Sequence, residues 1–71
     1  MGLFIKSKDD YNKKGLQFLE EGNLDEAAIQ FIKAIEKCDG SDPILYWNLG
    51  FTQFYMGQSD IAEQNIEYAA Q

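Results

Sequence analysis

Apolar residues recur along this chain in four blocks with helical spacing, and short polar segments that contain glycine or proline separate the blocks. In the second block Ala27, Phe31 and Ile35 follow one another at intervals of four residues, with Ala28 and Ile32 beside them. This spacing places all five on one side of a helix. The pattern predicts four helices, at about residues 8–21, 24–38, 43–56 and 60–70.

The residues at the breaks are of the kinds that begin and end helices. Ser7, Asn23 and Ser59 are the predicted N-caps, because a short polar side chain can accept a hydrogen bond from the first turn. Pro43 suits the first turn of the third helix. Gly22 suits the left-handed position that follows a helix, so we expect the first helix to stop there.

The chain also repeats itself with a period of 35 residues. The matched pairs are Tyr11 and Tyr46, Gly15 and Gly50, Leu19 and Phe54, Gly22 and Gly57, Asp25 and Asp60, Ala27 and Ala62, Phe31 and Ile66, and Ala34 and Ala69. We therefore expect an all-α fold of two tandem antiparallel helix pairs, with Gly15 and Gly50 allowing close approach within each pair. The register divides the chain into an apolar arm (1–7), a first repeat (8–41) and a second, uncapped repeat (42–71).

The repeat unit resembles the tetratricopeptide repeat (TPR), whose signature runs W-x2-L-G-x2-Y, then A-x3-F. The second unit reads Tyr46-x2-Leu49-Gly50-x2-Gln53 followed by Ala62-x3-Ile66, and the first reads Tyr11-x2-Lys14-Gly15-x2-Phe18 followed by Ala27-x3-Phe31. Lys14 and Gln53 depart from the family pattern. The resemblance covers nearly the whole chain and implies a short right-handed α-solenoid.

The resemblance implies that the first helix of each repeat lines a concave groove, and that the groove binds a peptide or a protein segment. The candidate partner-binding residues are Asn12, Leu16, Leu19, Trp47, Asn48, Phe51, Phe54 and Tyr55. Phe51 lies four residues after Trp47, with Phe54 and Tyr55 three and four residues later, so the aromatic side chains form one stripe.

Two interpretations of this aromatic stripe remain open. It binds a hydrophobic segment of another protein, or it is core, covered by the apolar arm Leu3-Phe4-Ile5 or by a second copy of the chain. The carboxylate clamp known in the family is not favoured. Asn48 matches one clamp asparagine, but Leu16 stands at the other, and an acidic chain is a poor partner for an acidic peptide.

The end of the second repeat predicts self-association. Ile61, Ile66, Tyr68 and Ala69 are expected to leave apolar surface where a third repeat would stack. A homodimer through the C-terminal repeat would cover this surface. The alternative function is therefore an oligomerisation unit, or a fragment of a longer TPR protein with its aromatic face buried in a homodimer.

Composition narrows the function classes. Hydrophobic residues make up 45% of the chain, which is too high for a disordered tail, and 71 residues support at most one domain. A net charge of −6 without arginine disfavours nucleic acid. Without histidine, and with Cys38 as the single cysteine, we expect no enzyme, no metal site and no cofactor. No apolar stretch approaches the ~20 residues of a membrane span, so we expect no membrane partner and a cytoplasmic protein.

Overall fold

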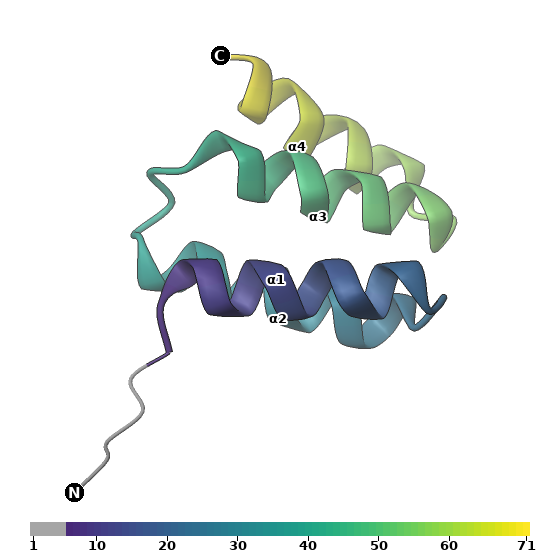
Figure 1. Ribbon diagram of the computed structural model, residues 1–71. Helices are drawn as coiled ribbons and strands as arrows, with labels where there is room; N and C mark the ends of the chain where they lie inside the picture. The colour runs from purple at the N-terminus through teal and green to yellow at the C-terminus, as the bar shows by residue number, and fades with distance from the viewer. Residues whose placement is uncertain (1–5) are drawn as a thin grey trace, which may run out of the picture.

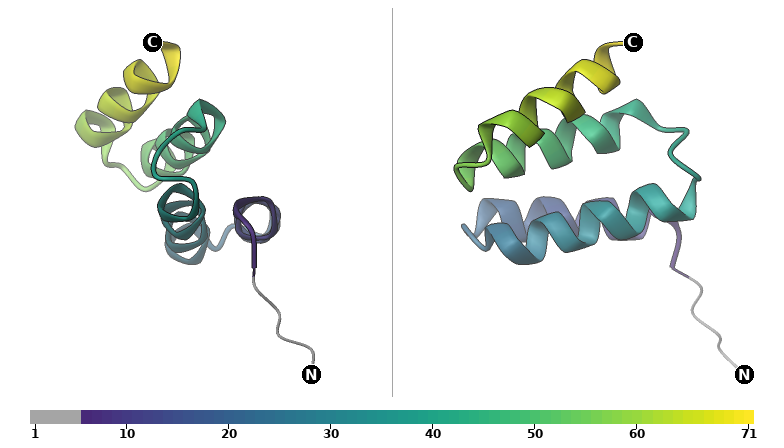
Figure 2. Two further views of the ribbon diagram at one scale, coloured as in Figure 1. Left: turned by 90° about the vertical axis from the view of Figure 1, so that its left-hand side faces the viewer. Right: turned by 180° about the vertical axis from the view of Figure 1, so that it is seen from behind.

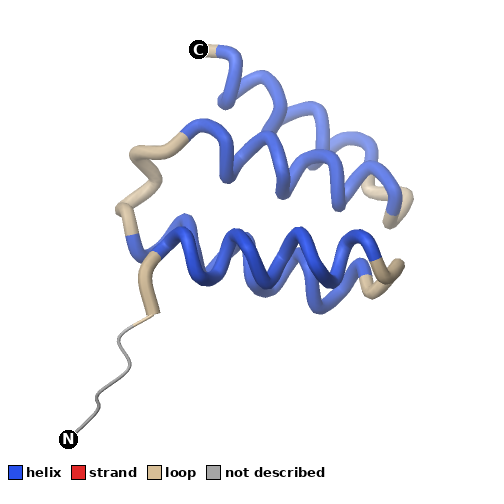
Figure 3. Tube along the Cα trace, viewed as in Figure 1, coloured by secondary structure: helices blue, strands red, loops and turns tan. Residues whose placement is uncertain are grey.

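The computed structural model describes residues 6–71, and within that range the chain forms four helices and no strand (Figures 1 and 3). They are α1 (Lys8–Glu20), α2 (Leu24–Lys37), α3 (Pro43–Tyr55) and α4 (Ser59–Ala70). α1 packs against α2 and α3 against α4, and α2 joins the two pairs by packing on α3. The predicted all-α fold of two stacked antiparallel helix pairs is confirmed. Leu3-Phe4-Ile5 lies outside the described residues.

Three of the predicted helix boundaries are confirmed by their local geometry. Ser7 is the N-cap of α1 in a capping box: its hydroxyl accepts from the Asp10 N–H at 3.3 Å, and the Asp10 carboxylate accepts from the Ser7 N–H at 3.0 Å. Gly22 and Gly57 follow α1 and α3 with φ of +82° and +83°. This left-handed backbone is the conformation that terminates a helix after its last turn.

Two predicted caps differ from the structure. Asn23 occupies the N-cap position of α2, but its side chain makes no capping hydrogen bond. Its side-chain nitrogen lies 3.5 Å from the Glu21 carboxylate. Ser59 is the first residue of α4 rather than its cap, and Gln58 holds the cap position. Both helices therefore begin with their first N–H groups uncapped by side chains.

Gly22, which follows α1, allows a test of the left-handed backbone conformation that ends the helix. We expect Gly22→Ala to cost about 1 kcal/mol of unfolding free energy, because a Cβ is unfavourable in the left-handed region. No atom lies within 4 Å of the added Cβ, so the cost is conformational rather than steric. Urea unfolding measures it. Gly22→Asn serves as control and should lose less, because asparagine tolerates this conformation; equal losses for the two variants would contradict the assignment.

The core lies where a large side chain of one helix covers a glycine of its partner. Phe31 is fully buried, and a Cβ at Gly15 would come within 2.6 Å of the Phe31 ring. In the second pair a Cβ at Gly50 would come within 2.7 Å of Ile66. The predicted close approach at both glycines is confirmed. Ala27, Ala28 and Phe31 of the first pair then pack with Leu49 of α3, which links the pairs into one core.

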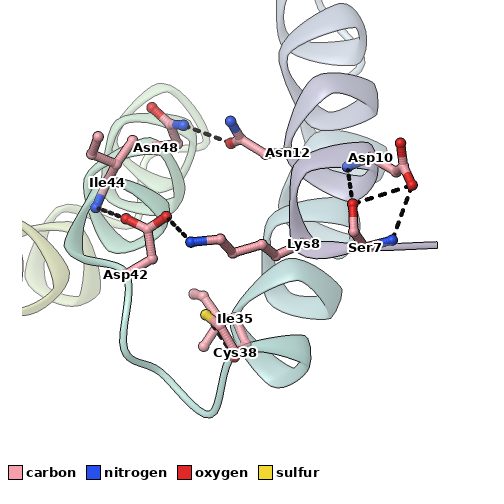
Figure 4. A network of polar contacts seen from close by, with 9 residues as sticks. All are labelled: Ser7, Lys8, Asp10, Asn12, Ile35, Cys38, Asp42, Ile44 and Asn48. Atoms are coloured by element: carbon pink, nitrogen blue, oxygen red, sulfur yellow. Dashed lines mark hydrogen bonds and ion pairs between the residues drawn. The ribbon is translucent and has the colours of Figure 1, made fainter.

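Polar contacts join the two pairs at the end of the molecule opposite the α1–α2 turn (Figure 4). The Lys8 ammonium bonds the Asp42 carboxylate at 2.8 Å, and the Asn48 side-chain amide donates to the Asn12 oxygen at 2.8 Å. Asp42 is also the N-cap of α3 and accepts from the Ile44 N–H at 3.1 Å. The hydrogen bond from Lys8, aided by the Ile44 N–H, lowers the pKa of Asp42 below 3.8.

These contacts predict a pH-dependent difference between two substitutions at Asp42. Asp42→Ala removes both the cap and the ion pair and should cost about 1 kcal/mol or more. Asp42→Asn keeps a capping oxygen and should lose less. Because the folded pKa of Asp42 is depressed, its charge stabilises the fold above pH 3.8 and this contribution disappears as the pH falls further. Thermal unfolding at pH 7 and pH 3 tests this: the margin by which wild type exceeds Asp42→Asn should be smaller at pH 3 than at pH 7, and an equal margin at both would contradict it.

Candidate protein-binding surface

α1 and α3 together form one face of the molecule, and a groove runs between them. Both helices lie in front of α2 and α4 in Figure 1, and the view from behind reverses this order (Figure 2). The groove lies at the end of the molecule where α1 turns into α2 and has a volume of about 710 Å³. Its lining residues are Leu16, Leu19, Glu20, Gly22, Leu24 and Tyr55. The groove is therefore largely apolar, with a single carboxylate in its lining.

The predicted aromatic stripe is exposed. Trp47, Phe51, Phe54 and Tyr55 all lie on the surface of α3, with Phe54 58% and Tyr55 67% accessible to solvent. Neighbouring rings contact one another edge to face, Trp47 on Phe51 at 5.0 Å between centroids and Phe54 on Tyr55 at 6.3 Å. Within residues 6–71 these side chains are thus not core, and they keep one another in an ordered array.

The remaining predicted site residues divide between the groove and the junction of the helix pairs. Leu16 is exposed in the groove. Leu19 lines the groove but also packs on the core cluster, so only part of it is free. Asn12 and Asn48 bond each other across α1 and α3. Their hydrogen bond fixes the spacing of the two helices that form the groove.

Three groove residues, Glu20, Gly22 and Leu24, lie outside the predicted set. Leu24, the first residue of α2, and Gly22 line both the groove and an adjoining hollow of about 510 Å³. The other residues of that hollow are Asn23, Asp25, Glu26 and Met56. The signal for Leu24 was an apolar side chain directly after the helix-ending turn, where the second repeat has Ser59. The adjoining hollow adds two carboxylates beside the apolar groove.

The apolar residues expected at the end of the second repeat lie in two different places. Ile66 packs inside the pair against Gly50 and Ala69 is half-buried, because α4 turns this side toward α3. Ile61 and Tyr68 are exposed, although the Tyr68 ring also contacts Tyr46 at 4.4 Å between centroids. Ile66 and Ala69 therefore do not form the open apolar end that the sequence suggested.

Cys38 is the nucleophilic thiol of the chain. Its Sγ donates to the Ile35 carbonyl at 3.5 Å (Figure 4). Partial burial opposes its ionisation, but hydrogen bonds from Asp42 and Ser41 outweigh burial and lower the pKa below 9.0.

No group of three or more His, Cys, Asp and Glu side chains within residues 6–71 is placed to hold a metal ion. None of the helices in the described part of the chain has the length and apolar character that crossing a membrane requires.

Comparison with known proteins leaves the site to be interpreted from its own geometry. No protein-family model matches the sequence, and neither a curated protein nor a solved structure matches it.

Proposed function

We propose that this chain is a protein-interaction module of the TPR type, which binds an apolar segment of another protein in the groove between α1 and α3. The observation that carries the proposal is the groove itself: Leu16, Leu24 and Tyr55 offer apolar surface to solvent between two helices. Trp47 and Phe51 are further exposed rings on α3, the helix that carries Tyr55. Concave apolar surface with a few polar groups is the usual form of a binding site.

The charges around the groove indicate which segment it accepts. Glu20 lines the groove, and Asp25 and Glu26 line the adjoining hollow. The whole chain has a net charge of −6, so its negative electrostatic field adds to that of these carboxylates. A segment with apolar side chains followed by lysine or arginine therefore complements the site. We place the module in the cytoplasm, because a single unpaired cysteine suits a reducing compartment.

Self-association is the second candidate function, and the exposure of Phe51 and Tyr55 favours it. A homodimer through the C-terminal repeat, or a longer TPR protein of which this chain is part, would cover both rings. Sedimentation equilibrium tests whether the chain forms this homodimer. A monomer at micromolar concentration would exclude it.

A display selection from random peptides tests the groove. We expect selected peptides to carry apolar residues followed by lysine or arginine. Leu16→Asp should weaken the best peptide by at least about ten-fold, because it places a charge in the apolar contact. Ile29→Asp is the matched control, since Ile29 lies on α2 and is 43% exposed against 42% for Leu16. Fluorescence anisotropy of a labelled peptide measures the affinity of each variant. An equal loss of affinity in both variants would contradict binding in the groove.

A further inference from the structure

The first helix pair uses a defined set of residues to hold the second pair. Lys8 and Asn12 bond Asp42 and Asn48 of the second pair. Leu19, Ala28 and Ile35 belong to, or pack on, the core cluster that contains Leu49 of α3. All five residues are buried or half-buried, namely Lys8, Asn12, Leu19, Ala28 and Ile35. They define the side of a repeat on which the next helix packs.

The same five positions of the second pair are uncovered. With the 35-residue period they are Pro43, Trp47, Phe54, Glu63 and Ala70, and every one of them is exposed. We call this set, together with Glu67 one turn after Glu63, the open edge. By the 35-residue period it corresponds to the side of the first pair on which α3 packs. The fold thus presents a helix-packing surface without a helix on it.

The side chains of the open edge differ in chemistry from those at the equivalent positions of the first helix pair. Asn12 and Leu19 are replaced by the larger apolar Trp47 and Phe54. On the other helix, the buried Ala28 is replaced by Glu63, and the apolar Ile32 by Glu67. A helix with a purely apolar face, such as the one α3 presents to α2, would place its side chains on these carboxylates and desolvate them.

We infer that the open edge binds an amphipathic helix of another protein, with its apolar residues on Trp47 and Phe54 and lysine or arginine beside them facing Glu63 and Glu67. The surface differs from the groove between α1 and α3, so this interaction is additional to the proposed function. Aromatic anchors beside carboxylates favour such a helix over a neutral one, because the anchors supply contact area and the carboxylates select charge.

A second copy of this chain is a poor occupant of the open edge. If α1 of a copy took the place that α3 takes on the first pair, it would present Asp10, Lys14, Gln17 and Glu21. These side chains are exposed and polar, so they would leave the two rings without apolar contact. Two-fold pairing of the open edge would instead bring two copies of Glu63 and Glu67 into one interface, to which the open edge contributes no lysine or arginine. Both arrangements bring like charges or unmatched polar groups together.

Two designed helical peptides of about 18 residues test the inference. They share one leucine face and differ only in flanking residues, which are lysine in one and glutamate in the other. Anisotropy of the labelled peptides against the full chain should show that the lysine peptide binds about ten-fold more tightly. Trp47 is the only tryptophan, so its emission should shift to the blue when the lysine peptide binds.

Three variants assign the binding to the open edge. Glu63→Lys combined with Glu67→Lys should reverse the preference between the peptides, and Phe54→Ser should weaken both. These residues are exposed, so the fold should survive, and far-UV circular dichroism checks this. Leu16→Asp in the groove should change neither affinity, which separates this inference from the proposed function. Equal binding of both peptides, a preference that the charge reversal leaves unchanged, or a dimer abolished by Phe54→Ser would overturn it.

Discussion

Phe31→Ala should remove most of the stability of this protein. Phe31 has no solvent-accessible surface, and its ring lies against Gly15 of the neighbouring helix. Truncating a buried phenylalanine costs about 3–5 kcal/mol, through lost transfer energy and the cavity left behind. A chain of 71 residues has only about 4–11 kcal/mol to lose. Urea unfolding followed by far-UV circular dichroism measures the loss.

The next residue along the chain supplies the control for this substitution. Ile32→Ala removes a side chain of similar apolar character that is 43% exposed on the same helix. It should cost less than half as much as Phe31→Ala, because little packed volume disappears. If the two variants lose equal stability, Phe31 is not the centre of the first helix pair.

Gly15→Ala should destabilise the protein even though alanine is the better helix former. In a free helix the substitution gains about 1 kcal/mol. Here the new Cβ would lie 2.6 Å from Cε1 of Phe31, and the buried ring has no space into which it can move. Overpacking of this kind costs about 1–3 kcal/mol, so the net change should be a loss.

A double variant shows whether the clash is the cause. Phe31→Leu shortens the opposing side chain, so Gly15→Ala should cost less in that background than in the wild type. The two substitutions are in contact and should therefore be non-additive. Thermal unfolding of the wild type, the two single variants and the double variant completes this double-mutant cycle. A stabilised Gly15→Ala single variant would show that the helices of the first pair are farther apart than described.

Local chemistry explains why so much of the fold followed from the sequence. The Ser7 cap, the left-handed Gly22 and Gly57, and the glycines at the helix contacts each depend on one residue type in one place. The 35-residue period repeats such signals, so each helix pair confirms the assignment of the other. Asn23 shows the limit of this reasoning, because it holds the N-cap position of α2 and yet makes no capping hydrogen bond through its side chain.

The candidate site was harder to predict because it depends on what packs against each position. Leu19 and Phe54 occupy equivalent places in the two repeats, yet Leu19 is half-buried against the core cluster that includes Leu49, and Phe54 is 58% exposed. The period predicts that both positions are apolar, but only the stacking of the pairs distinguishes core from surface. In the same way, the pairing of Asn12 with Asn48 joins residues that are 36 positions apart.

The central claim is that the face formed by α1 and α3 binds a segment of another protein. A nitrogen-15 correlation NMR titration with the best peptide from the display selection tests it most directly. The account predicts that the largest shifts fall on Leu16, Leu24 and Tyr55, which line the groove. Shifts centred instead on Ile29 and Ile32, on the outer surface of α2, would contradict it.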